Sequence, residues 1–268
     1  MTTTNRGRTR INILILLISA VTWMMLLVNP AGSIMSVAHC PVMDSGASAV
    51  SFQMMLEMNP ISSLMAGWAL MLVAMMTPTL ITPIHHVRER SFKRRRVRSV
   101  TLLLIGYAAI WMAAGAVLIA SMLMLNLLLP QSYLPATAVG IIAFVWQCSP
   151  IKQRCLNRNH NHRELAAFGA AADADALRFG AAHGVWCVGS CWALMLFPML
   201  LSQGHFAAMA LVTYVMISER LEHSRPLTWR LRFPLKLMRI AIAQSRIRLQ
   251  NLSPNSRPPS SSSTGLNR

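Results

Sequence analysis

The chain has 268 residues, of which 54% are hydrophobic and only 12% are charged. Soluble domains carry roughly a quarter charged residues, so this composition excludes an ordinary water-soluble protein and predicts one embedded in a bilayer. The formal charge is +17, and its placement along the chain, described below, argues against nucleic acid as the partner. Five cysteines, an odd number without the spacing of a small secreted domain, argue against a disulfide framework.

Six apolar segments predict transmembrane helices. In chain order, they cover residues 11–28, 64–84, 101–129, 134–151, 183–203 and 205–219. The first is longer than the apolar part of a signal peptide, roughly 7–15 residues, so we expect an uncleaved anchor. Pro78 and Pro83 loosen the end of the second segment, and the fourth reaches a useful length only by continuing through Pro150. The sixth is short for a span.

The distribution of basic residues predicts the topology and supports counting the short sixth segment as a span. With six spans, all 25 Lys and Arg residues fall on one side of the membrane, and the other side has none. Because basic loops stay in the cytoplasm, both termini are predicted to be cytoplasmic. The run "RERSFKRRRVR" after the second span predicts contact with anionic lipid headgroups. The fold class is therefore an all-α polytopic membrane bundle.

The bundle is one domain, residues 11–221, and the remaining segments differ in character. Residues 1–10 form a basic cytoplasmic N-terminus. Residues 222–252 combine apolar and basic side chains and predict an amphipathic helix on the inner membrane surface. Residues 253–268 are rich in Ser and Pro, which predicts a disordered tail.

The stretch "HGVWCVGSCWALMLFPM" in the fifth span holds the main candidate site. Every fourth residue has a side chain that soft metal ions prefer: His183, Cys187, Cys191, Met195 and Met199. Thiolate and thioether ligands favour Cu(I), and thioethers are neutral, so they hold a cation in hydrocarbon without a buried anion. The alternative is an apolar helix that packs with sulfur-containing side chains.

Two further sulfur clusters lie in the second and fourth spans. Met71 and Met75 are four residues apart, with Met76 adjacent, and their level matches that of Cys191 and Met195. Cys148 and Cys155 share a face with Lys152 if the helix continues past Pro150, and a neighbouring lysine favours the thiolate that binds metal. Interhelical packing explains either cluster as well.

Other candidate ligands lie in predicted loops. Residues 39–58, which include His39, Cys40 and several methionines, form an external segment that either captures Cu(I) or lies on the bilayer. His160 and His162 are in a polar internal loop, and such histidines are more often solvated than metal-bound.

Three motifs and an acidic–basic pair resemble a bacterial family of predicted metal-binding integral membrane proteins, sometimes labelled copper chaperones. The motifs are "WALMLVAMMTP" at Trp68–Pro78, "WQCSPIKQRCL" at Trp146–Leu156 and "HGVWCVGSCWALM" at His183–Met195, followed by the pair Glu219–Arg220. The resemblance extends over residues 64–221 and implies a multi-pass protein of the bacterial inner membrane. Two thiols of the family pattern are missing: Ser190 replaces the first of two adjacent cysteines, and residues 157–159 lack a cysteine.

The sequence therefore predicts a protein that binds Cu(I) and passes it on by ligand exchange, for transport or for delivery to a membrane or periplasmic partner protein. The predicted metal ligands are Cys187, Cys191, Met195, His183, Met75, Met71, Met76, Cys155 and Cys148. The alternative is a structural or assembly subunit without metal, in which Gly180, Gly184, Ala109 and Ala113 make close helix contacts. An enzyme is not predicted, because the chain has no zinc-protease motif, nucleophile elbow or phosphate-binding loop.

Overall fold

The computed structural model describes residues 3–28, 60–129, 133–160, 166, 169–201, 203–222, 226–229, 238–240 and 242–246. The main elements of this part are all helical, and it contains no strand. The helices are α1 (Thr3–Val28), α3 (Ile61–Met76), the 3-10 helix η3 (Thr77–Leu80), α4 (Ile81–Arg90), α5 (Arg96–Leu128), α6 (Leu134–Cys148), α7 (Pro150–His160), α8 (Gly169–Met199) and α9 (His205–Arg220). The predicted all-α class is thus confirmed for these residues. The external segment 39–58, His162 and the tail 253–268 lie outside them.

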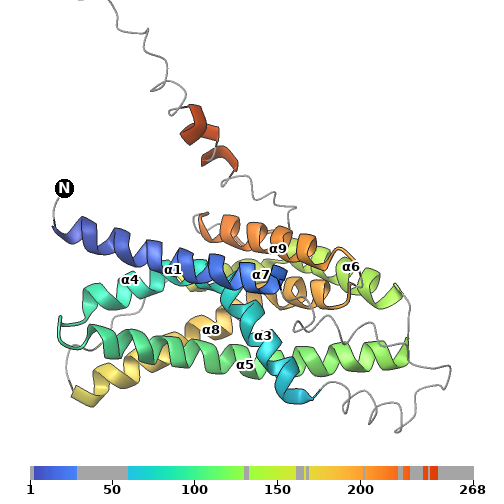
Figure 1. Cartoon of the computed structure of the whole chain (residues 1–268), viewed down its shortest axis with the longest axis horizontal. Helices are drawn as coiled ribbons and strands as arrows, with labels where there is room; N and C mark the ends of the chain where they lie inside the picture. Colours follow the sequence, from blue (N-terminus) through green and yellow to red (C-terminus); the bar gives the residue numbers. More distant parts are fainter. Residues whose placement is uncertain are drawn as a thin grey trace, which may run out of the picture.

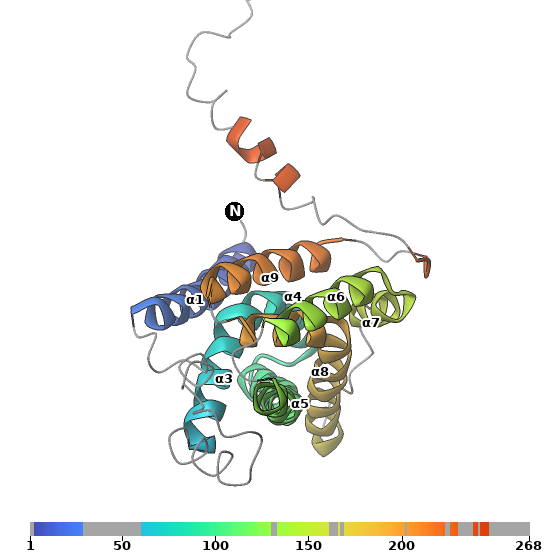
Figure 2. The same cartoon turned by 90° about the vertical axis from the view of Figure 1, so that its right-hand side faces the viewer.

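The two longest of the described helices, α5 with 33 residues and α8 with 31, run side by side and organise the bundle (Figures 1 and 2). α8 also contacts α6, α7 and α9. α1 packs on α3, η3 and α4, and it lies on the same side of the bundle as α9. This arrangement places one face of α8 at the junction of several helices.

Glycines allow α5 and α8 to approach each other backbone to backbone. A Cβ added at Gly180 would lie 2.1 Å from the carbonyl oxygen of Leu103, and one at Gly106 would lie 2.4 Å from that of Leu177. Gly184 is also in this interface. Two of the small residues expected to make close helix contacts, Gly180 and Gly184, therefore do so. The other two, Ala109 and Ala113, are on the exposed face of α5.

Trp68 joins α3 to α5. Its indole is fully buried, and Nε1 donates a hydrogen bond of 3.1 Å to the carbonyl oxygen of Trp111. Gly115 leaves the space that the indole fills. We expect Trp68→Phe to lower the free energy of unfolding by about 1–2 kcal/mol, because it removes this hydrogen bond and leaves a small void. Thermal unfolding in detergent measures the effect, and Trp229→Phe, at an exposed tryptophan, is the control that should leave stability unchanged.

The second and fourth predicted spans are interrupted. Pro78 lies in η3, where the second span changes from α to 3-10 geometry before α4 continues through Pro83. The fourth segment is not one helix: α6 and α7 meet at an angle of 65°. Ser149 between them is extended, with ψ 139°, because a residue before proline avoids the helical region, and Pro150 begins α7. The segment predicted as one span, residues 134–151, is therefore two helices, and its crossing of the membrane stays a prediction.

The fifth segment begins at Gly169 rather than at His183. Residues 170–182 are rich in alanine, the strongest helix former, which extends the helix ahead of the predicted span. In the part of the chain that the structure describes, four helical segments are long and apolar enough to cross a membrane: Arg6–Val28, Ile61–Arg90, Arg96–Leu128 and Gly169–Met199. The bent pair α6–α7 gives a fifth if it counts as one span. α9 has 16 residues and falls below that length.

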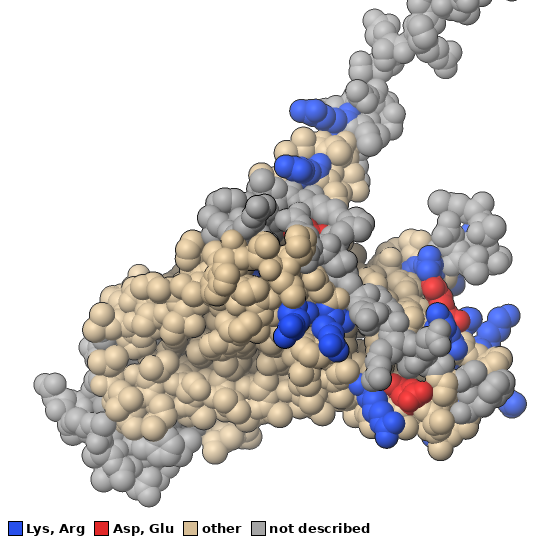
Figure 3. Space-filling model, turned by 180° about the vertical axis from the view of Figure 1, so that it is seen from behind, with Lys and Arg blue, Asp and Glu red and all other residues tan. Residues whose placement is uncertain are grey.

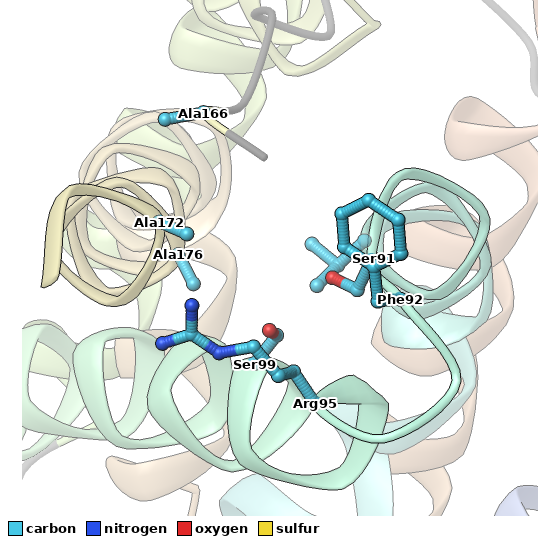
Figure 4. Close-up of a pocket in the computed structure, with 8 residues that line it drawn as sticks. Ser91, Phe92, Arg95, Ser99, Ala166, Ala172 and Ala176 are labelled. Atoms are coloured by element: carbon cyan, nitrogen blue, oxygen red, sulfur yellow. The ribbon is translucent and has the colours of Figure 1, made fainter. Parts of the chain in front are cut away.

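Basic side chains gather at one end of the bundle, whereas a broad face of the remainder is free of charge (Figure 3). At this end α4 finishes and α5 begins, and Asp173 near the start of α8 pairs with Arg95 at 2.9 Å and with Arg98 at 2.7 Å. Figure 4 shows a small cavity there, with Ser91, Phe92, Arg95 and Ser99 facing the alanines of α8. This cavity contains no sulfur ligand, so it is not the candidate metal site.

Candidate metal site

A second cavity, among η3, α7, α8 and α9 and the end of α3, is lined by sulfur. Its volume is about 10 Å³, which is the space that one water molecule or one ion occupies. The lining residues are Met76, Thr79, Leu156, Cys187, Ser190, Cys191, Met216, Glu219 and Arg220. Two thiols and two thioethers from three helices therefore face one small space.

The two thiols come from the helix that the sequence singled out. Cys187 and Cys191 are four residues apart on α8, and side chains at this spacing lie on one face with about 5–6 Å between their Cβ atoms. All five residues of the every-fourth-residue series are buried. The series thus faces the interior, but only Cys187 and Cys191 reach the cavity.

Cys187 is held among polar groups. Arg220 donates a hydrogen bond from Nη2 to the Cys187 sulfur at 2.9 Å, and the Tyr107 hydroxyl lies 3.3 Å from the same sulfur. Cys191 donates from its sulfur to the Cys187 carbonyl oxygen at 2.9 Å. A guanidinium beside a sulfur favours the thiolate, which is the form that binds metal.

Arg220 is itself positioned by α7. With its amide oxygen turned toward the guanidinium, Asn159 accepts hydrogen bonds from Nη1 and Nη2 of Arg220, and its amide nitrogen donates to Nδ1 of His183 at 3.1 Å. The His183 ring also packs against Tyr107 and Phe179. His183 therefore supports the surroundings of Arg220 and does not line the cavity.

A buried ion pair lies at the edge of the cavity. Lys152 Nζ is 2.6 Å from Glu219 Oε1, and the exposed fractions of the two side chains are 2% and 12%. Gln147 donates to the same carboxylate oxygen and accepts from Lys152. Because Gln147 and Lys152 lie on either side of the bend at Ser149, this network fixes the α6–α7 bend against α9.

Several predicted ligands lie elsewhere. Met71, Met75 and Met195 are buried in the apolar core, outside the cavity lining. Cys155 is buried against α8, where a Cβ at Gly189 would come within 2.9 Å of its sulfur. Cys148 is half-buried at the end of α6, and the bend separates it from the face of α7 that holds Lys152.

Four residues of the site were not among the predicted ligands: Met216, Glu219, Arg220 and Tyr107. The pair Glu219–Arg220 was visible as part of the family resemblance, but nothing in it indicated contact with Cys187. Tyr107 is a polar side chain within a long apolar segment, and such a position indicates a functional site from the sequence alone. No sequence pattern distinguishes Met216 as a ligand, since it is one of 20 methionines.

His, Cys, Asp and Glu side chains alone do not complete a metal site in the described cavity. Within the described ranges, no three or more His, Cys, Asp or Glu side chains form a group that could hold a metal ion. Any ion bound in the cavity would therefore need the thioethers of Met76 and Met216 in addition to the two thiols. Thioethers are ligands of soft ions.

These features define the class: an all-helical protein with several helices apolar enough to cross a membrane and a small cavity lined by thiols and thioethers. The family model PpoB2, described as "Copper chaperone", matches residues 65–241, and the chain belongs to this family. The resemblance drawn from the three motifs is thus confirmed. No curated protein and no solved structure matches the chain.

Proposed function

We propose that the protein is an integral membrane protein that binds Cu(I) in the sulfur-lined cavity and passes it on by ligand exchange. The proposed ligands are Cys187, Cys191, Met76 and Met216. The single observation that carries the proposal is that these four side chains line one ion-sized cavity. Membership of a family described as copper chaperones supports copper as the cargo.

The ligand chemistry supports a monovalent soft ion. Thiolates and thioethers are the protein ligands that select Cu(I). Glu219 is the one carboxylate in the cavity lining, and Lys152 and Gln147 already occupy its Oε1. Interruptions of a helix often form ion sites within membranes. The 3-10 helix η3 interrupts the second predicted span, and its Thr79 lines the cavity.

The proposed setting is the bacterial inner membrane, with six spans and both termini in the cytoplasm. α5 has 33 residues and is therefore about 50 Å long, longer than the roughly 30 Å of hydrocarbon in a bilayer. The basic end of the bundle (Figure 3) would then project into the cytoplasm, with anionic lipid headgroups at its margin. α9, at 16 residues, would be a short sixth span.

Cargo transfer by ligand exchange needs no covalent chemistry, so the proposed role is not catalytic. Ligand exchange requires a competing thiolate or thioether, which a partner protein would supply. We propose that such a partner, in the membrane or the periplasm, receives or supplies the ion.

Anaerobic Cu(I) titration of the purified protein in detergent tests the proposal. The competing ligand is a coloured Cu(I) chelator, which reports the free ion. We expect the double variant Cys187→Ser, Cys191→Ser to bind one equivalent of Cu(I) fewer than the unmodified protein, because the cavity loses both thiolates. Cys148→Ser, a cysteine outside the cavity lining, is the matched control and should bind normally. Equal binding by the unmodified protein and the double variant would contradict the proposed site.

A further inference from the structure

His205 is a buried histidine at the point where α9 begins. It is 7% exposed, although Gln203 and Gly204 just before it are exposed. Nδ1 of His205 donates a hydrogen bond of 3.0 Å to the carbonyl oxygen of Pro198, near the end of α8. Because a carbonyl oxygen only accepts, Nδ1 carries the proton, and in the neutral ring the lone pair is on Nε2. A histidine that ligates a metal is held in the same way, by donation from its other ring nitrogen to a carbonyl or carboxylate.

α8 and α9 run antiparallel, and contacts at two levels fix their alignment. At one end of the interface His205 bonds to Pro198, and at the other Arg220 bonds to the Cys187 sulfur at 2.9 Å. The positions between these contacts therefore follow each other in order from the sulfur-lined cavity to His205. The α8–α9 interface connects the two places.

Two buried methionines accompany His205. Met209 is four residues after His205 on α9, so the two side chains share a face, with about 5–6 Å between their Cβ atoms. Met199 directly follows Pro198, to which His205 bonds. Both methionines are 1% exposed and belong to one core cluster. One imidazole and two thioethers are thus placed together where α8 ends and α9 begins.

Met195 lies between these residues and the cavity. It is fully buried, four residues from Met199 and four from Cys191 on α8. Each of these steps rises about 6 Å along the helix. The thioethers of Met199 and Met195 therefore form a continuous series of soft ligands that ends at Cys191 in the cavity lining.

We infer that His205, Met199 and Met209 form a second Cu(I) site, here called the junction site, through which the ion passes between the exposed residues 203–204 and the cavity. All three ligands are neutral, so they hold a monovalent soft ion without a buried anion. Thiolates bind the same ion more strongly, so Cu(I) moves from the junction site toward Cys191 and Cys187. The inference rests on the proposed function for the identity of the ion.

The test is an anaerobic Cu(I) titration of the full-length protein in detergent, in the background Cys187→Ser, Cys191→Ser. This background lacks the thiolates of the cavity and should keep one weaker equivalent of Cu(I) at the junction site. His205→Asn in this background should weaken that equivalent at least 10-fold, since even a group that only supports a ligand is worth roughly 10- to 100-fold in affinity. Asparagine keeps an N–H for the Pro198 carbonyl and removes Nε2, so a histidine with only a structural role would show no loss. His85→Asn, at the half-buried histidine bonded to Asn12, is the matched control.

The thioethers are tested by Met199→Leu combined with Met209→Leu, in the same background. Leucine and methionine replace each other in a core at little cost, so this variant should fold and lose the same equivalent of Cu(I). Met122→Leu, at a buried methionine of α5, is its control and should bind normally.

The two proposals fail in different ways. Cu(I) binding by the background that neither His205→Asn nor the paired methionine variant weakens would overturn the junction site and leave the cavity untouched. Equal binding by the unmodified protein and the background would overturn the proposed function, whatever the junction variants do. If His205→Asn does not fold, the paired methionine variant decides: unchanged binding overturns the inference.

Discussion

Lys152→Met should lower the free energy of unfolding by about 3–5 kcal/mol, the usual cost of removing one partner of a buried ion pair. Methionine fills a similar volume but leaves Glu219 as a buried carboxylate without its cation. Gln147 alone cannot neutralise that charge. The loss should be visible as a lower midpoint of thermal unfolding in detergent.

A second variant separates the charge from the contact. Lys152→Met combined with Glu219→Leu replaces the pair by apolar side chains and should recover most of the lost stability, because a buried ion pair often contributes little beyond its apolar replacement. Arg154→Met, at an exposed neighbour on α7, is the matched control. If Lys152→Met and Arg154→Met unfold at the same temperature, the ion pair does not hold α9 against the bend.

The helices and the inward face of α8 were predictable because they depend on local patterns. Long apolar runs predict helices wherever a chain avoids water, and α1, α3, α5 and α8 are found at those runs. Sulfur at every fourth residue also predicted one buried face, and Cys187 and Cys191 are both buried there. The early start of α8 was missed because the prediction followed the apolar run alone, whereas the alanines of residues 170–182 extend the helix beyond that run.

The composition of the cavity could not be predicted, because it depends on how separate helices meet. Met76 rather than Met71 or Met75 lines the cavity with the thiols. This choice depends on how the end of α3 packs against α9 and on the change to 3-10 geometry at Thr77. Arg220 was assigned to the cytoplasmic side by its charge. Its contact with Cys187 requires α9 to lie across α8, which no local pattern specifies.

The bend at Ser149 could be predicted only in part from the sequence. A proline at position 150 was a visible signal, since proline is favoured in the first turn of a helix and disfavours helical geometry in the residue before it. The same proline is compatible with a kinked continuous helix. The bend is stabilised by Lys152 and Gln147 on Glu219, a contact between distant parts of the chain.

The closest approach of α5 and α8 leads to the second large effect: Gly180→Ala should destabilise the protein by roughly 3 kcal/mol, the upper part of the range for overpacking. The added Cβ would meet the carbonyl oxygen, carbonyl carbon and Cα of Leu103 at 2.1, 2.8 and 2.9 Å. All three are backbone atoms, so no side-chain rotation relieves the clash and the two helices must separate.

The separation of α5 and α8 should also change the geometry of the candidate metal site. Tyr107 on α5 lies 3.3 Å from the Cys187 sulfur on α8, and this contact lengthens if the helices move apart. We therefore expect Gly180→Ala to weaken Cu(I) binding as well as to lower the unfolding midpoint, both measured on one preparation. Gly7→Ala on α1, where an added Cβ has nothing within 4 Å, is the control and should be neutral or slightly stabilising, since alanine favours a helix more than glycine does. An unfolding midpoint for Gly180→Ala equal to that of Gly7→Ala would mean that α5 and α8 do not pack this closely.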